Sequence, residues 1–425
     1  MYKLKLDSPA SLKILNMGIR AISMLSRFIL VMILAKLLPA SELGTYGLLV
    51  AAISFAVLFV GFDYYTYSNR ELLSVDNDRW SEIILNQLYA YIPLYLVAIP
   101  FSFILNGYGF LPKQYFTWFL TLFVIEHISI EQNRLLNTMQ KQLSASFVLF
   151  LRSGIWIIFM LPLLIYVDGY KNLETVLYAW VIGGICSILY GIWVIKKSIK
   201  NWTLITPSYS WIIKGYKVGV LFILGTLSFR LISTGDKFLL EQMSNINIVG
   251  VYVFYSSLTV GATAFIHAGV IVFSTPKIIT AYHKKDKLLF KRLMNQFFKE
   301  LSFSIILMIL GLYFFMPYVV TWIGKSEYFE HYEAFYIILI TASLTLIGSH
   351  PGTYLYAARR DKYIVWSNVS VLIVFLVLSW IFYTHTMEFT ALYRVSILVM
   401  LTFLWSIFVK YIGYFYYSNK EKIER

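Results

Sequence analysis

Four cations lie in two stretches of the sequence that are otherwise apolar enough to cross a bilayer. Arg20 and Arg27 are seven residues apart, as are Arg230 and Lys237, so each pair shares one face of a helix. A charge at the centre of a membrane helix costs roughly 2.5–3.5 kcal/mol, so such residues usually face an interior cavity. Arginine is well suited to bind an anion, because its planar guanidinium stays protonated and can donate hydrogen bonds to two phosphate oxygens at once. These residues therefore predict a cationic cavity.

The alternative for Arg20 and Lys237, which lie nearer the ends of their stretches, is that the side chains reach the lipid headgroups. Four lipid-facing cations would cost roughly 10 kcal/mol by simple summation, which favours a cavity for the set as a whole. Arg152, in a third apolar stretch, is a further candidate for this cavity.

Acids in apolar stretches are candidates for binding a coupling ion. Asp236 adjoins Lys237, and neighbours on a helix point in different directions. We therefore expect Asp236 to pair with Arg230 or with an arginine of the first stretch, or to titrate as an ion site. Asp63 comes at the inner end of a span, where a capping or interfacial role competes with a proton site.

A second acidic group interrupts another apolar stretch. Glu126 and Glu131 are five residues apart, and His127 is offset from both. The pattern leaves two interpretations open, an ion relay or structural ion pairs with Arg152 and Arg134 on neighbouring helices. Nothing in the sequence has the spacing of a metal site, and we expect neither a metal nor a cofactor.

The two cationic stretches belong to an internal repeat. Residues 20–30 and 230–240 both read Arg-x-Ile-Ser, then a cation seven positions after the Arg, then Phe-x-Leu. Gly44-Thr45-Tyr46 follows the first copy, and Gly250-Val251-Tyr252 follows the second. The sequence therefore contains two related halves, offset by about 210 residues.

Composition indicates a multi-pass membrane protein. Hydrophobic residues make up 59% of the chain, charged residues only 14%, and the mean hydropathy is +0.69. The net charge of +14 is explained by cytoplasmic loops, so no nucleic acid partner is expected. The single cysteine excludes an internal disulfide. No Walker loop is present, so the chain alone does not use ATP.

Twelve stretches have the length and apolarity of a transmembrane helix. They are 14–36, 43–63, 83–105, 115–136, 144–167, 174–195, 218–241, 248–273, 297–317, 334–357, 363–384 and 389–412, with 115–136 the weakest because of its charges. Alternate loops, such as 196–217 and 277–299, carry most of the Lys and Arg. By the positive-inside rule, both termini are expected in the cytoplasm.

An even number of spans per half makes the two halves parallel. The predicted organisation is an N-terminal six-helix lobe at 1–200, a cytoplasmic linker at 201–217 and a C-terminal six-helix lobe at 218–425. The two lobes would be pseudo-symmetric, with the ligand site expected between them.

Several motifs together resemble a known family. Leu43-Gly44-Thr45-Tyr46-Gly47, Asn69-Arg70-Glu71, Gly235-Asp236-Lys237-Phe238 and Pro276-Lys277 are similar to those of polysaccharide flippases of the Wzx (O-antigen transporter) type. Those flippases belong to the multidrug/oligosaccharidyl-lipid/polysaccharide exporter (MOP) superfamily. The resemblance covers essentially the whole chain.

This resemblance implies a function. The chain would move an undecaprenyl-pyrophosphate-linked oligosaccharide, an O-antigen or capsule repeat unit, from the inner to the outer leaflet of the bacterial inner membrane. The lobes would alternate by a rocker switch driven by a proton or sodium gradient. The pyrophosphate would meet Arg27, Arg230 and their neighbours. Membrane lipids and the polysaccharide polymerase machinery are the other expected partners.

Two rival functions are retained. A drug exporter of the same superfamily would need cavity acids for cationic drugs, whereas this chain offers mostly Arg and Lys. A membrane-embedded polysaccharide polymerase or ligase would carry a large external catalytic loop, which the predicted spans do not leave room for. We therefore expect a transporter rather than an enzyme.

Overall fold

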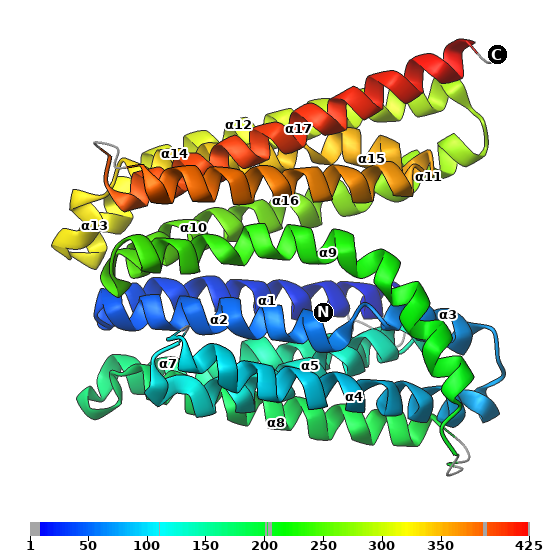
Figure 1. The fold of residues 1–425 in the computed structure, drawn as a ribbon, viewed down its shortest axis with the longest axis horizontal. Coiled ribbons are helices and arrows are strands. Elements are labelled where there is room, and N and C mark those ends of the chain that lie inside the picture. The colour runs from blue at the N-terminus through cyan, green and yellow to red at the C-terminus, as the bar shows by residue number, and fades with distance from the viewer. Residues whose placement is uncertain (1–8, 110, 200–201, 203–205, 386–388, 424–425) are drawn as a thin grey trace, which may run out of the picture. The chain divides into compact units, whose positions relative to one another are not determined.

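The structure is a computed structural model that describes residues 9–109, 111–199, 202, 206–385 and 389–423. All regular structure in this part of the chain is helical (Figure 1). The two chain ends (1–8 and 424–425) and part of the predicted linker (201 and 203–205) lie outside the described residues. The cytoplasmic placement of the termini and the domain boundaries therefore stay predictions.

The described chain forms two compact units. Unit 1 holds the described residues up to Leu38, together with Thr45–Ile223, and unit 2 holds Pro39–Gly44 and the described residues from Leu224 onward. The helices of unit 1 are α1 (Pro9–Leu37), α2 (Ala40–Gly61), α3 (Tyr65–Leu73), η1 (Asn77–Arg79), α4 (Trp80–Gly107), η2 (Lys113–Tyr115), α5 (Phe116–Thr138), α6 (Gln142–Phe150), η3 (Leu151–Ile155), α7 (Trp156–Tyr166), η4 (Asp168–Tyr170) and α8 (Leu173–Ser198), the start of α2 belonging to unit 2.

The helix α9 (Tyr209–Met243) passes from unit 1 into unit 2. The other helices of unit 2 are α10 (Ile246–Ile266), η5 (His267–Ile271), α11 (Val272–His283), α12 (Lys287–Ile323), α13 (Ser326–Glu330), α14 (Ala334–Ile347), α15 (Ser349–Ala357), α16 (Asp361–Thr384) and α17 (Ala391–Ile423).

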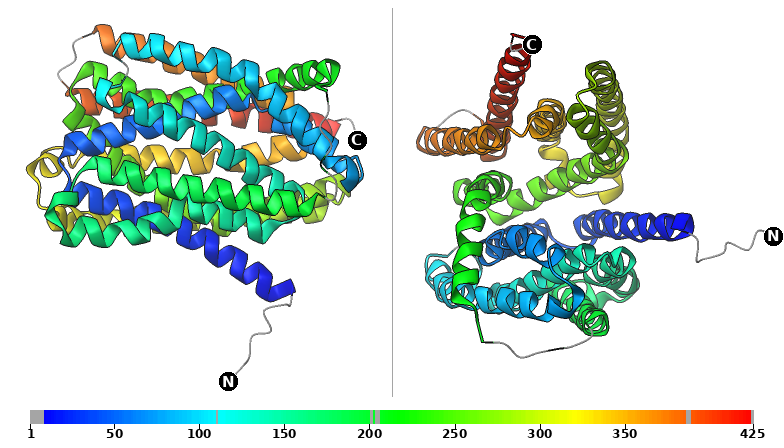
Figure 2. Two further views of the ribbon diagram at one scale, coloured as in Figure 1. Left: turned by 90° about the horizontal axis from the view of Figure 1, so that it is seen from below. Right: turned by 90° about the vertical axis from the view of Figure 1, so that its right-hand side faces the viewer.

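Each unit is a bundle of long helices packed side by side (Figures 1 and 2). In unit 1, α5 packs against both α6 and α8, and α1 packs against α6, η3 and α7. In unit 2, α17 packs against α14, α15 and α16, while α11 packs against α12 and α15. Helices satisfy all their backbone hydrogen bonds internally, which is the condition for crossing a bilayer.

Ten of these helical segments are long and apolar enough to cross a membrane, and α9, which is bent, counts as an eleventh if its two parts form one span. The remaining expected span, 115–136, corresponds to α5. This helix has 23 residues, but it is not among the segments that meet the same criterion, and Glu126, His127 and Glu131 interrupt its apolar sequence. The weakest expected span is thus a helix of spanning length whose apolar surface is interrupted by charge.

Several helices extend beyond the spans expected from hydropathy. The expected span 297–317 lies inside α12, which begins at Lys287 and has 37 residues. Asp286 caps its start by accepting a hydrogen bond from the Leu289 N–H at 2.9 Å, and Gly324, with φ of +73°, ends it. Hydropathy marks the apolar part of a helix, whereas caps mark its ends.

Two of the long helical segments contain a π-helical turn. The turn η3 lies between α6 and α7, and η5 lies between α10 and α11. A π turn is wider than an α turn by one residue, and it often occurs at functional sites. Arg152 belongs to η3, and His267 begins η5.

The two glycines that the internal repeat aligns meet one another within unit 2. A Cβ atom at Gly44 would overlap the carbonyl oxygen of Ile246, and one at Gly250 would overlap that of Ala40. Only glycine permits this approach of two helix backbones. The repeated Gly-x-Tyr motif therefore has a packing role at this contact.

Candidate functional site

Arg27 is a cation in the middle of an apolar helix. It lies near the centre of the 23-residue apolar span Leu15–Leu37 in α1, and its side chain is exposed. It makes no hydrogen bond or ion pair with a residue that the structure describes. Its charge is close enough to act on Arg152 and on Tyr46. Arg27 therefore has its guanidinium available for a ligand.

Arg20, two turns earlier, is already engaged. Its Nε donates to the Ser146 hydroxyl of α6 at 2.8 Å, and its guanidinium reaches the Asn137 side-chain oxygen at 3.4 Å. The Ser146 hydroxyl in turn hydrogen bonds with Asn16. Arg20 and Arg27 therefore share a helix face but differ in role, because the first links α1 to its neighbours.

The buried acid Glu126 pairs with Arg152. Their side chains lie 3.7 Å apart, and the Trp180 indole N–H donates to Glu126 at 2.7 Å. The Nε and Nη1 atoms of Arg152 are buried and make no hydrogen bond with the described residues. The expected ion pair between α5 and the helix that carries Arg152 is confirmed, and the arginine retains unused donors.

A second acid of α5, Glu131, accepts hydrogen bonds from three side chains. Tyr91 and Gln87 of α4 donate to its Oε2 at 2.7 and 3.1 Å, and Arg134 donates to its Oε1 at 2.6 Å. An ion pair with Arg134 was expected across neighbouring helices, which was wrong, because Arg134 lies one turn after Glu131 on α5 itself. The contribution of α4 was not expected, because Tyr91 and Gln87 are neutral and their spacing of four residues is common in any helix.

His127 lies beside this group. Its Nδ1 is 2.7 Å from the Tyr95 hydroxyl, while its Nε2 is buried and has no hydrogen-bond partner among the described residues. The side chain is 1% exposed. Unit 1 thus places a histidine and two carboxylates on α5, with each carboxylate bound to an arginine.

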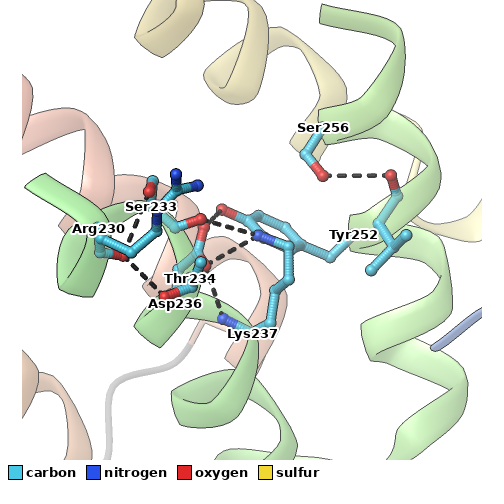
Figure 3. A network of polar contacts seen from close by, with 8 residues as sticks. Arg230, Ser233, Thr234, Asp236, Lys237, Tyr252 and Ser256 are labelled. Atoms are coloured by element: carbon cyan, nitrogen blue, oxygen red, sulfur yellow. Dashed lines mark hydrogen bonds and ion pairs between the residues drawn. The ribbon is translucent and has the colours of Figure 1, made fainter. Parts of the chain in front are cut away.

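In unit 2, Asp236 and Lys237 form an ion pair on one helix. The Lys237 Nζ lies 3.1 Å from Asp236 Oδ1 and also donates to the Ser233 carbonyl at 3.2 Å. Tyr252 of α10 points toward Asp236 and donates to its Oδ2 at 2.7 Å (Figure 3). The expected separation of neighbouring side chains was wrong here, because the long lysine side chain folds back over its own turn.

Arg230 is half-buried on the same helix, two turns before Lys237. Its carbonyl accepts hydrogen bonds from the Ser233 and Thr234 hydroxyls at 3.2 and 2.7 Å (Figure 3). Such bonds to a preceding carbonyl are common for hydroxyl side chains within helices. Arg230, Asp236 and Lys237 thus lie together in unit 2, as Arg27, Glu126 and Arg152 do in unit 1.

Asp63 lies at the break between α2 and α3, two residues before Tyr65, whose ring contacts the Arg134 guanidinium. The backbone φ of Asp63 is +47°, after Phe62 at +49°, which is a strained conformation for residues other than glycine. The side chain is 4% exposed, and its Oδ2 has no hydrogen-bond partner among the described residues. The Thr66 hydroxyl donates to its carbonyl at 2.8 Å, which stabilises the turn.

This fold is shared with solved structures of membrane transporters. The chain matches the inward-facing structure of a multidrug resistance MATE family transporter of the MOP superfamily, with a TM-score of 0.75 and 16% identity, over 96% of this chain and 99% of that one. An outward-facing structure of such a transporter matches with a TM-score of 0.62 and 16% identity, over 96% of both chains. The chain therefore has the multi-pass fold of MOP transporters.

Lipid II flippase MurJ, in an inward closed conformation, has the same fold. It matches with a TM-score of 0.70 and 14% identity, over 95% of this chain and 87% of that one. No curated protein sequence matches this chain. Residues 14–273, more than half of the chain, match the family described as "Polysaccharide biosynthesis protein". The chain belongs to that family.

Proposed function

We propose that this protein is a flippase that moves an undecaprenyl-pyrophosphate-linked oligosaccharide, an O-antigen or capsule repeat unit, across the bacterial inner membrane. The family supports a role in polysaccharide synthesis, and the fold shared with a lipid II flippase supports a lipid-linked cargo. In this proposal the chain acts by alternating access, as a transporter, and hands its cargo to polymerase machinery.

The observation that carries this proposal is the exposed Arg27 in the middle of α1. A cation at that depth is costly unless a counter-charge reaches it, and Arg27 forms no ion pair with a described residue, because the nearby acid Glu126 is paired with Arg152. A pyrophosphate supplies that charge and can bind the guanidinium through two oxygens. Arg230 and Lys237 of unit 2 and Arg152 of unit 1 complete the proposed set, with Arg20 in a supporting role.

An ion gradient is proposed to drive transport. Among the three acids suggested for ion coupling, Glu126 and Asp236 already bind a cation and a hydrogen-bond donor each. Asp63 differs, because one of its buried oxygens has no partner among the described residues. We therefore favour Asp63 for the binding of a proton or sodium ion.

Multidrug export is the second candidate, and the likeness to MATE transporters is the observation that favours it. The two functions differ in the charge of the cargo. A cationic drug would be repelled by Arg27 and Arg230, so their neutralisation would leave drug export intact or improve it. An anionic cargo would lose its binding partner.

The test is complementation of a strain from which the gene is deleted. Arg27→Gln, alone and with Arg230→Gln, is expected to lower surface polysaccharide at least tenfold and to trap lipid-linked repeat units in the inner leaflet. Arg79→Gln is the matched control, because Arg79 is exposed and lies outside the cluster. Full transport by Arg27→Gln would contradict the proposal. Units that reach the outer leaflet but stay unpolymerised would indicate a polymerase or ligase instead.

A further inference from the structure

Unit 2 contains a cavity that the proposed pyrophosphate set does not use. Its volume is about 570 Å³, and α9, α10, η5, α11, α14, α15 and α17 contribute to its walls. Much of the polar lining consists of hydroxyl side chains, among them Thr263, Thr275, Ser349, Thr353, Tyr356 and Ser406. The volume falls in the range of roughly 300–1,000 Å³ that is typical of small-molecule sites.

Two glycines lie on the face of the α14–α15 segment that lines the cavity. Gly348 and Gly352 are one turn apart and both line the cavity. A Cβ atom at Gly352 would meet nothing within 4 Å, so the space in front of it is open. Neighbouring lining positions, such as Ser349 and Thr353, carry hydroxyls at the same spacing. The open face therefore carries hydroxyl groups within a cavity whose remaining walls are largely apolar.

One cation faces this cavity. Lys410 of α17 lines it together with Ser406 and Ile407, and its side chain is only partly exposed. The outer face of the same helix carries exposed apolar side chains such as Phe408 and Ile412, so Lys410 points the other way. An inward-facing ammonium in a membrane helix needs a counter-charge.

That counter-charge is not supplied by the part of the chain that the structure describes. No Asp or Glu lines the cavity, and Lys410 makes no ion pair or hydrogen bond with a described residue. This is unlike Lys237, which has Asp236 beside it. An anionic group of a ligand would complete the pairing that the protein leaves open.

The hydroxyls of the cavity are free to bind the rest of such a ligand. Ser349 lines the cavity, and its side-chain hydroxyl makes no hydrogen bond with a described residue. Thr353 and Thr345 donate to carbonyls of their own helix at 2.8 and 2.7 Å, which leaves their oxygens able to accept. A ligand rich in hydroxyl groups offers both donors and acceptors to such a surface.

We propose that this cavity binds a phosphorylated sugar, with the phosphate at Lys410 and the sugar hydroxyls along Thr345, Ser349 and Thr353. Lysine binds phosphate as a point charge, and hydroxyl groups pair with the ring substituents. The assignment of this ligand to the head of the transported lipid rests on the proposed function. The binding of a phosphorylated sugar in the cavity is inferred from the cavity residues alone and does not rest on the proposed function.

The test is direct binding to the purified full chain in lipid nanodiscs, by calorimetry. The probes are a hexose 1-phosphate, the free hexose, inorganic phosphate and the same hexose phosphate linked to a polyprenyl chain. The hexose 1-phosphate is expected to bind at least tenfold more tightly than either of its parts alone. Equal binding of inorganic phosphate and hexose 1-phosphate would overturn the role of the hydroxyls.

Variants locate the site. Lys410→Met is expected to weaken binding of the hexose 1-phosphate about 10- to 100-fold, whereas Lys410→Arg retains most of it. Gly352→Leu is expected to abolish binding by filling the cavity. The controls are Lys362→Met, at an exposed lysine, and Gly311→Leu, at an exposed glycine of α12 whose Cβ would also meet nothing within 4 Å. Unchanged binding in both Lys410→Met and Gly352→Leu would overturn the proposal.

The polyprenyl-linked probe separates this inference from the proposed function. Tighter binding of the linked form than of the soluble sugar phosphate is the expected result for a transported lipid. Equal affinity would overturn the assignment to the cargo while leaving the site itself in place. Conversely, if Arg27→Gln abolishes flipping but the hexose 1-phosphate does not bind to the wild-type protein, the sugar phosphate site is wrong and the proposed flippase function stands.

Discussion

Two regions of the molecule, helix α5 in unit 1 and the cavity of unit 2, use charge in different ways. In unit 1, Glu126 and Glu131 are each bound to an arginine, and partners from α4, α8 and η3 join α5 through them. In unit 2, Lys410 faces an open cavity without such a partner among the described residues. Paired charges hold helices together, whereas an unpaired charge beside open space leaves a position for a ligand. The difference separates structural charges from binding charges.

The largest expected effect comes from breaking a pair in unit 1. Glu126→Gln leaves Arg152 buried without a counter-charge, and loss of one partner of a buried ion pair costs about 3–5 kcal/mol. We expect a clear fall in the thermal unfolding temperature of the protein in detergent. The double variant Glu126→Gln/Arg152→Met is expected to recover most of the loss, because it removes both charges.

The matched control for this substitution is Glu82→Gln. Glu82 also pairs with an arginine, Arg79, but at 37% and 62% side-chain exposure. Exposed pairs contribute about 0–1 kcal/mol, so the unfolding temperature is expected to change little. Equal losses in Glu126→Gln and Glu82→Gln would contradict the structural role assigned to the pair in unit 1.

A smaller effect is expected in unit 2 from Tyr252→Phe. This change removes one hydrogen bond to the Asp236 carboxylate, worth about 1.5–3 kcal/mol for a charged acceptor, while Lys237 remains in place. The unfolding temperature measured as above should fall by less than in Glu126→Gln. Tyr313→Phe, at an exposed tyrosine, is the control. A fall in unfolding temperature as large as that of Glu126→Gln would mean that Lys237 does not neutralise the charge of Asp236.

The smallest effect is expected at an exposed pair outside the membrane helices. Lys171 lies 2.5 Å from Asp168, and its hydrogen bond and charge lower the pKa of that carboxyl. A lowered pKa in the folded state favours folding above the ordinary pKa of aspartate, and this contribution is lost as the pH falls. Lys171→Met should therefore raise the pKa of Asp168 toward its ordinary value, as measured by NMR titration. Because Asp168 is fully exposed, the unfolding temperature should fall only slightly, and a drop as large as that of Tyr252→Phe would contradict this assignment.

The sequence was sufficient for the fold class because apolar length and charge spacing are local properties. The stretches around Arg20 and Arg230 form helices, and the charge of Glu126 and Glu131 explains why α5 differs from the other long helices. The ion pair of Glu126 with Arg152 was expected as one of two alternatives, since few cations lie in the neighbouring spans.

Other parts of the candidate site could not be predicted from the sequence. Nothing in the sequence around Lys410 distinguishes it from other lysines near the end of a membrane span. Only the packing of α17 shows that it faces a cavity. Gly352 and Thr353 likewise have no distinctive pattern, because their role depends on the space in front of them. The pairing of Asp236 with Lys237 depends on side-chain rotamers, which spacing along a helix does not specify.

The π-helical turn η5 has a consequence for comparing this chain with distant relatives. The cavity lining on this segment comprises Val260 and Ala264 before the turn, His267 and Ile271 at its two ends, and Thr275 after it. A relative with an uninterrupted α-helix here needs one residue fewer to reach the same face. An alignment must therefore place a single-residue gap at η5. Without it, every later position of α11 would be matched to a residue on a different face, and an equivalent of Thr275 would be missed.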